Sequence, residues 1–171
     1  MLATLGIEML TVTVGWQVYG LTGQALDLGL IGLAQFAPFG LLFLVTGMVA
    51  DRFSRTKILI FCVSVQTLTA AAFLVMTVTG SARFGLIFGL LVVFGIARSF
   101  QSPVQQSIVP LLVQGAAFPS AIMWNNMGGK IARIVGPATG GLLIALGETT
   151  GLREALVYGT STLLLCAALV F

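Results

Sequence analysis

The chain of 171 residues is 58% hydrophobic and only 8% charged, contains no histidine, and has a mean hydropathy of +1.09. Soluble domains carry roughly a quarter charged residues, so this composition excludes a water-soluble globular protein. The formal net charge of +3 comes from eight basic and five acidic residues that form no aromatic-backed basic patch, which argues against a nucleic-acid partner. The surroundings that suit this composition are the lipid bilayer.

Six apolar segments follow one another along the chain. Clusters of charge, glycine and proline separate them, because backbone in contact with lipid has to satisfy its hydrogen bonds inside a helix and loops fall at the interfaces. With about 20 apolar residues needed per crossing, we predict an all-α membrane protein with six transmembrane helices in a single unit, residues 1–171. The predicted helices cover residues 2–21, 28–50, 58–79, 85–101, 121–146 and 155–171.

Two parts of the chain depart from a simple row of helices. The segment 102–120 holds three prolines, which predicts a broken or interfacial stretch between the fourth and fifth helices. The last segment is still apolar at Phe171, without the polar anchor that marks a membrane boundary. We therefore predict that the chain is a fragment of a longer protein.

The basic residues of the short loops predict the orientation in the membrane. Arg52, Arg55 and Lys57 lie together between the second and third helices, whereas Arg83 and Arg153 are isolated in loops on the opposite side. Cytoplasmic loops carry the excess of Lys and Arg, so this loop and both chain ends are predicted to be cytoplasmic.

The residue inventory argues against catalysis and against ATP use. Without histidine there is no His-based metal site and no Ser/His or Cys/His nucleophile pair, and no set of paired carboxylates offers acid–base chemistry. Cys62 and Cys166 lie in apolar runs, where small buried hydrophobes are expected. The pattern G-x-x-x-x-G-K-[ST] is missing from the sequence, which argues against an ATP-driven pump. We expect no enzyme, no metal and no cofactor.

The most specific local pattern is GMVADRFSRTK, between the second and third helices. Gly47 lets another backbone approach closely, and Asp51 can pair with an arginine or accept N–H groups from a neighbouring helix start. Arg52 and Arg55 offer charges whose contacts can form or break with conformation. The alternative is a simple positive-inside anchor, which is common in membrane proteins.

This pattern resembles the signature of the major facilitator superfamily, G-x-x-x-D-R-x-G-R-[RK], which in that superfamily lies between helices two and three. Four positions match the signature: Gly47, Asp51, Arg52 and Arg55. Ser54 stands where the superfamily usually has Gly, and Thr56 where it usually has a basic residue. The resemblance implies a gating role for the four matching residues at the cytoplasmic face.

A second pattern, ARIVGPATGG, lies in the fifth predicted helix. Pro137 removes a backbone donor and bends the helix, while Gly136, Gly140 and Gly141 leave a groove for another helix. It is similar to the Gly-Pro signature of antiporters and efflux proteins of the superfamily. The alternative is an ordinary packing face of small residues.

Two charged residues fall inside apolar segments. Arg98, in GIARSFQSP, resembles the intramembrane arginine of the superfamily's fourth helix; a central charge costs about 2.5–3.5 kcal/mol, so a function is the default interpretation unless the side chain reaches the interface. Glu8 could bind a proton, a cationic substrate or Arg98. Lys130 and Arg133 share one helix face near the start of the fifth helix, where they could complete the cytoplasmic rim or line a cavity for an anionic substrate; we favour the rim.

The whole pattern resembles the exporter branch related to enterobactin and macrolide efflux proteins, and covers about half of such a transporter. The resemblance implies a six-helix N-terminal half, built from two inverted three-helix repeats, in a bacterial cytoplasmic membrane. It also implies proton-coupled efflux of a small molecule, such as a siderophore, drug or other metabolite, by alternating access, with substrate moving out against proton entry. Its partners would be protons and either the missing C-terminal half or a second copy.

The rival hypothesis is a six-helix membrane scaffold that transports nothing. It would dimerise through small-residue faces such as Gly85–Gly89 and Gly136–Gly140. A scaffold has no use for Glu8 or Arg98 inside the membrane, so water access to these two positions separates the two hypotheses.

Overall fold

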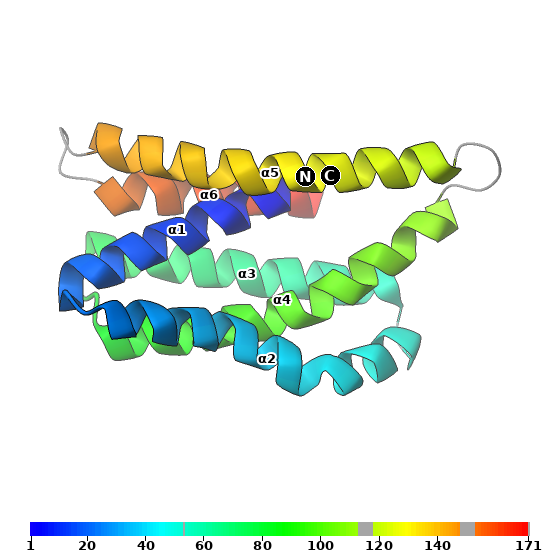
Figure 1. Cartoon of the computed structure of the whole chain (residues 1–171), viewed down its shortest axis with the longest axis horizontal. Coiled ribbons are helices and arrows are strands. Elements are labelled where there is room, and N and C mark those ends of the chain that lie inside the picture. The colour runs from blue at the N-terminus through cyan, green and yellow to red at the C-terminus, as the bar shows by residue number, and fades with distance from the viewer. Residues whose placement is uncertain (53, 113–117, 148–152, 171) are drawn as a thin grey trace.

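The computed structural model describes residues 1–52, 54–112, 118–147 and 153–170, except for the side chains at 43, 44, 50, 51, 102, 106–112, 118, 119 and 121. Within these residues the chain forms six α-helices that run along one long axis (Figure 1). They are α1 (Leu2–Thr22), α2 (Ala25–Arg52), α3 (Arg55–Val78), α4 (Phe84–Leu112), α5 (Phe118–Gly147) and α6 (Arg153–Val170). The predicted all-α fold is confirmed.

The end of the fourth helix was predicted wrongly. It was placed at residue 101, but α4 continues past Pro103 to Leu112. Gln101 bonds across to α3 and Val104 is buried, so packing continues on both sides of the proline. Neighbouring helices make up for the lost backbone bond in such positions, which is why proline is tolerated inside membrane helices.

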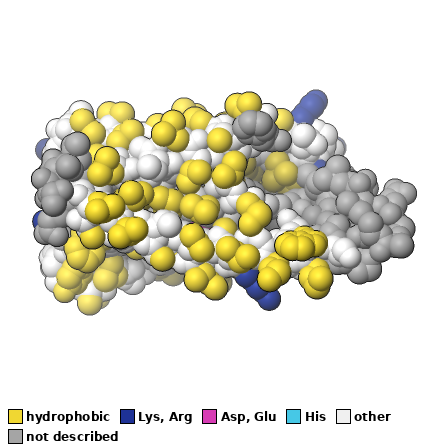
Figure 2. Space-filling view, turned by 90° about the horizontal axis from the view of Figure 1, so that it is seen from above, with side chains coloured by type: hydrophobic (Ala, Val, Ile, Leu, Met, Phe, Trp, Pro, Cys, Tyr) yellow, Lys and Arg dark blue, Asp and Glu magenta, His cyan; other side chains and the backbone are white. Residues whose placement is uncertain are grey.

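Five of the six described helices are long and apolar enough to cross a membrane. Their qualifying windows are Ala25–Leu42, Arg55–Val78, Phe84–Gln105, Ile122–Gly147 and Arg153–Val170. The helix outside this set is α1, in which Glu8 and Gln17 lower the mean hydropathy. Large hydrophobic side chains cover much of the surface in Figure 2, as lipid contact requires. The chain is an integral membrane protein.

The six helices form two sets related by their contacts, α1–α3 and α4–α6. The most extensive contacts of α1 are with α5 and α6, and those of α4 are with α2 and α3. If each helix of α1–α3 is exchanged for its counterpart in α4–α6, the α1–α5 contact becomes the α4–α2 contact, and the α1–α6 contact becomes the α4–α3 contact. The α3–α6 contact is unchanged by this exchange. This exchange is what two three-helix repeats predict. The helices α1 and α4 make few contacts with each other.

Polar side chains connect neighbouring helices in the interior. Gln66 of α3 donates a 2.7 Å hydrogen bond to Gln101 of α4. Gln17 of α1 donates to Thr77 of α3 over 2.9 Å and accepts from the Tyr158 hydroxyl of α6 over 2.8 Å. Interhelical hydrogen bonds of this kind contribute about 0.6 kcal/mol each on average in membrane proteins. They tie α3 to both α4 and α1.

Candidate functional site

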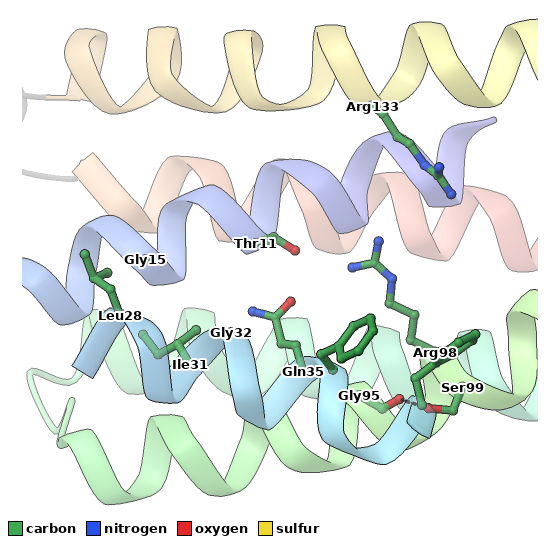
Figure 3. Close-up of a pocket in the computed structure, with 12 residues that line it drawn as sticks. Thr11, Gly15, Leu28, Ile31, Gly32, Gln35, Gly95, Arg98, Ser99 and Arg133 are labelled. Carbon is green, nitrogen blue, oxygen red and sulfur yellow. Dashed lines mark hydrogen bonds between the residues drawn. The ribbon is translucent and has the colours of Figure 1, made fainter. Parts of the chain in front are cut away.

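A cavity of about 590 Å³ opens on the face formed by α1, α2, α4 and α5. Its volume is typical of small-molecule sites, which occupy about 300–1,000 Å³. Figure 3 shows Leu28 and Ile31 at one end and Arg98, Ser99 and Arg133 at the other. The full lining is Thr11, Gly15, Leu28, Ile31, Gly32, Gln35, Phe36, Phe39, Gly95, Arg98, Ser99 and Arg133.

Two further pockets share lining residues with this cavity. One of about 80 Å³ shares Arg98 and Arg133 with the main cavity and adds Glu8. Another, of about 360 Å³, shares Arg133 and adds Lys130, Asn125 and Asn126. Charged and amide groups therefore gather where the three pockets adjoin, and Leu28 and Ile31 lie at the far end of the main cavity.

An ion pair inside the bundle links the two sets of helices. The Arg98 Nη2 of α4 donates to the Glu8 Oε1 of α1 over 2.9 Å. The side chains are 36% and 16% exposed, so the pair lies at the edge of the cavity and is partly shielded. Because α1 and α4 otherwise touch little, this bond is a main connection between them. Of the options that the sequence left open for Glu8, the structure displays the pairing with Arg98.

The glycines of the fifth helix hold α5 directly against this ion pair. A Cβ added at Gly136 would lie 2.8 Å from the Glu8 Cβ and 3.3 Å from the Leu5 carbonyl oxygen. A Cβ at Gly140 would lie 3.4 Å from the Cα and carbonyl oxygen of Met9. The groove predicted from ARIVGPATGG is thus occupied by α1 itself. Gly141 takes no part in it, since nothing lies within 4 Å of its added Cβ.

Pro137 lies inside α5, next to this contact. Without an N–H group it leaves one backbone carbonyl of the preceding turn without its helical partner. The Thr139 hydroxyl donates to the carbonyl oxygens of Val135 and Gly136, both at 2.9 Å. The helix continues through the proline, half-buried beside α1.

The pattern GMVADRFSRTK lies at the C-terminal end of α2 and the start of α3. Gly47 is exposed, and no described atom lies within 4 Å of its added Cβ, so the close approach expected there is not found within the described residues. Arg52 ends α2 with an exposed side chain, and Arg55 begins α3 half-buried. Asp51 falls in the last turn of α2, but its side chain lies outside the described part of the chain.

Sequence reasoning missed much of the cavity. For Arg133 it favoured the rim over a cavity for an anionic substrate, and in the structure this exposed residue contributes to the lining of all three pockets. It also assigned nothing to the phenylalanines, although α2 carries a regular lining stripe: Leu28, Ile31, Gly32, Gln35, Phe36 and Phe39. These positions share one face of a helix, and a glutamine within an apolar stripe was the available signal.

Comparison with known proteins agrees with this architecture. The staphyloferrin A transporter of Staphylococcus aureus is 28% identical over 159 residues, which cover 91% of this chain and 40% of that protein. Macrolide efflux protein A of Streptococcus pyogenes is 26% identical over 152 residues, which cover 87% of this chain and 37% of that protein. The chain thus spans about two fifths of the length of these relatives. No solved structure matches it.

The family described as transmembrane secretion effector matches residues 1–170, nearly the whole chain. This match is consistent with the two signatures, GMVADRFSRTK and ARIVGPATGG, with the two three-helix sets, and with the cavity between these sets. The chain belongs to the transmembrane secretion effector family, within the major facilitator superfamily of membrane transporters.

Proposed function

We propose that this chain is the N-terminal half of a secondary transporter that exports a small molecule by alternating access, without changing it chemically. The observation that carries the proposal is the cavity between α1, α2, α4 and α5, with the Glu8–Arg98 pair at its edge. Charged residues inside a membrane bundle are costly and mark substrate or ion pathways, so a function is their default interpretation.

The proposed partner is a second six-helix half that covers the open cavity. The two relatives are more than twice as long as the part that matches, which leaves room for such a half. In transporters of this fold the two halves are related by an axis along the membrane normal, and the substrate site lies between them. A second copy of this chain is the alternative occupant of the same face. We place the protein in a bacterial cytoplasmic membrane with its N-terminus in the cytoplasm.

We propose that proton binding at Glu8 couples the transport cycle. Glu8 is the carboxylate among the described cavity residues, and its bond to Arg98 is a main link between α1 and α4. Protonation removes the charge that holds this bond, which allows the two helices to separate. Asp51, Arg52 and Arg55 would stabilise one state at the cytoplasmic face, and Gly136 with Pro137 would set how closely α5 follows α1.

The test is substrate accumulation in inverted membrane vesicles that contain the complete transporter. The probes are staphyloferrin A and a radiolabelled macrolide, the compounds for which the two relatives are named. Acidifying the vesicle lumen should increase accumulation of at least one probe. Glu8→Gln should abolish this increase, while Glu154→Gln in α6, outside the cavity, should retain it. Accumulation no higher than in vesicles without the protein would reject the proposal.

The scaffold remains the second candidate because Gly85 and Gly89 of α4 are exposed with open space beside them. Its other expected face is occupied within the chain, since Gly136 and Gly140 pack against α1. Cysteines placed at positions 8 and 98 separate the two functions. Labelling by a water-soluble maleimide indicates a transporter, and protection of both positions indicates a scaffold.

A further inference from the structure

We infer that the cavity binds an organic anion, with its charged group at Arg98 and Arg133 and its apolar part along α2. This assignment rests on the proposed transport function and names the substrate class for the same cavity. It goes against the preference of the sequence pattern, which placed Arg133 on the rim.

The first support is the charge balance of the lining. Arg98, Arg133 and Lys130 line the three adjoining pockets, whereas Glu8 is the one acidic residue among their described lining residues. Glu8 accepts a single bond from Arg98, and a guanidinium carries five N–H donors. Arg133 forms no ion pair with any described residue. The lining therefore has unused positive charge.

The second support is where this charge lies. Figure 3 shows Arg98 and Arg133 extending toward the same part of the cavity from α4 and α5. Two guanidinium groups repel each other, and water screens part of this repulsion because Arg133 is exposed and the Arg98 side chain is 36% exposed. An anion bound between them relieves this repulsion and can accept bonds from both. A cation would meet the same two arginines, with Glu8 already engaged.

The third support is the shape and polarity of the remaining cavity. The α2 stripe supplies Leu28, Ile31, Phe36 and Phe39, whose two aromatic rings lie 6.1 Å apart. Leu28 and Ile31 lie at the end of the cavity away from the two arginines, so the cavity matches a molecule with one charged end and one apolar end. Inorganic anions would leave most of the 590 Å³ unfilled.

The experiment uses two probes with the same apolar body and opposite charge. Naphthalene-2-sulfonate and naphthalen-2-ylmethylammonium are titrated by calorimetry against the complete transporter in nanodiscs of zwitterionic lipid. We expect the sulfonate to bind more tightly than the ammonium probe. Arg133→Gln should weaken sulfonate binding roughly tenfold, as expected for the loss of a charged hydrogen bond. Arg83→Gln, on the loop before α4, is the matched control and should bind as the parent does.

Variants of the Glu8–Arg98 ion pair distinguish an anion site from a cation site, because the two predict opposite changes in sulfonate affinity. Glu8→Gln should tighten sulfonate binding several-fold, because it frees Arg98 and removes a negative charge. A cation site predicts the opposite, since Glu8 would be its anchor. Arg98→Gln alone leaves a carboxylate unpaired and can impair folding, so the double variant Glu8→Gln with Arg98→Gln is used, which removes both charges of the pair and leaves the net charge of the lining unchanged. That variant should bind the sulfonate more weakly than Glu8→Gln does.

Three outcomes overturn the inference: tighter binding of the ammonium probe, sulfonate binding unchanged by Arg133→Gln, or binding of neither probe. The proposed transport function is tested by the vesicle assay, independently of these binding measurements. Sulfonate binding at Arg133 without transport of any probe would retain the anion site and reject the transporter. Proton-driven transport together with tighter binding of the ammonium probe would retain the transporter and reject the anion site.

Discussion

Replacing Gly136 by alanine should disturb the contact on which the ion pair rests. The added Cβ would lie 2.8 Å from the Glu8 Cβ, whereas ordinary contacts begin at 3.4 Å. The two helices must therefore move apart by about 0.6 Å, since carbon atoms pack at about 3.5–4.0 Å. The Glu8 Cβ is fixed to its backbone and cannot swing aside as the end of a long side chain does. The strain has to be taken up by the α1–α5 interface.

The free energy of unfolding should fall as a result. Overpacking of a tight contact costs about 1–3 kcal/mol, and the gain from replacing glycine in a helix offsets about 0.5–1 kcal/mol. We expect a net loss of roughly 1–2 kcal/mol for Gly136→Ala by this balance. Gly141→Ala, which meets nothing within 4 Å in the same helix, should be neutral or slightly stabilising. Gly140→Ala, with its nearest atoms at 3.4 Å, should fall between the two.

The assay is reversible unfolding of the detergent-solubilised protein, together with substrate accumulation in inverted vesicles. The order of stability should be Gly141→Ala, then Gly140→Ala, then Gly136→Ala, and accumulation should follow the same order. Equal stability and equal transport for Gly136→Ala and Gly141→Ala would refute the reasoning, because the two variants differ only in what their new methyl group meets.

Three further predictions concern the ion pair, the signature and the interior. Exchanging the charges with Glu8→Arg and Arg98→Glu should recover part of the transport that either single change abolishes, measured in vesicles; no recovery would mean that the 2.9 Å bond itself is not required. Asp51→Asn should reduce efflux with unchanged amounts of protein in the membrane, and transport at the parent rate would exclude the gating role. Tyr158→Phe removes the bond to Gln17 and should lower the free energy of unfolding by about 0.6–1.7 kcal/mol, with no change in stability as the contrary result.

The helices could be predicted from the sequence because each is apolar along its whole length, where it contacts either lipid or other helices. The six segments correspond to α1 through α6, with most ends within a few residues. The exception is α4, whose continuation past Pro103 depends on tertiary contacts of Gln101 and Val104 that no local rule contains. Proline signals the end of a helix only where nothing compensates for the missing donor.

The candidate site was predictable only in part, for a similar reason. The sequence marked Glu8 and Arg98 because a charge inside an apolar segment is costly wherever it lies. It could not place Arg133, since the same helix face serves a rim or a cavity depending on how α5 lies against α1. The close contact of Gly136 with Glu8 sets how α5 lies against α1. This contact exists only once the helices have packed, so the sequence alone does not reveal it.

Water access to the cavity from both sides of the membrane tests alternating access most directly. Thr11 lines the cavity, so Thr11→Cys, after replacement of Cys62 and Cys166 by alanine, reports this access to a membrane-impermeant maleimide. Val157→Cys, at a fully buried position, is the control. We predict labelling of Thr11→Cys in both right-side-out and inverted vesicles, with the ratio shifted by a proton gradient, and no labelling of the control. Labelling from one side alone, whatever the gradient, would contradict the account.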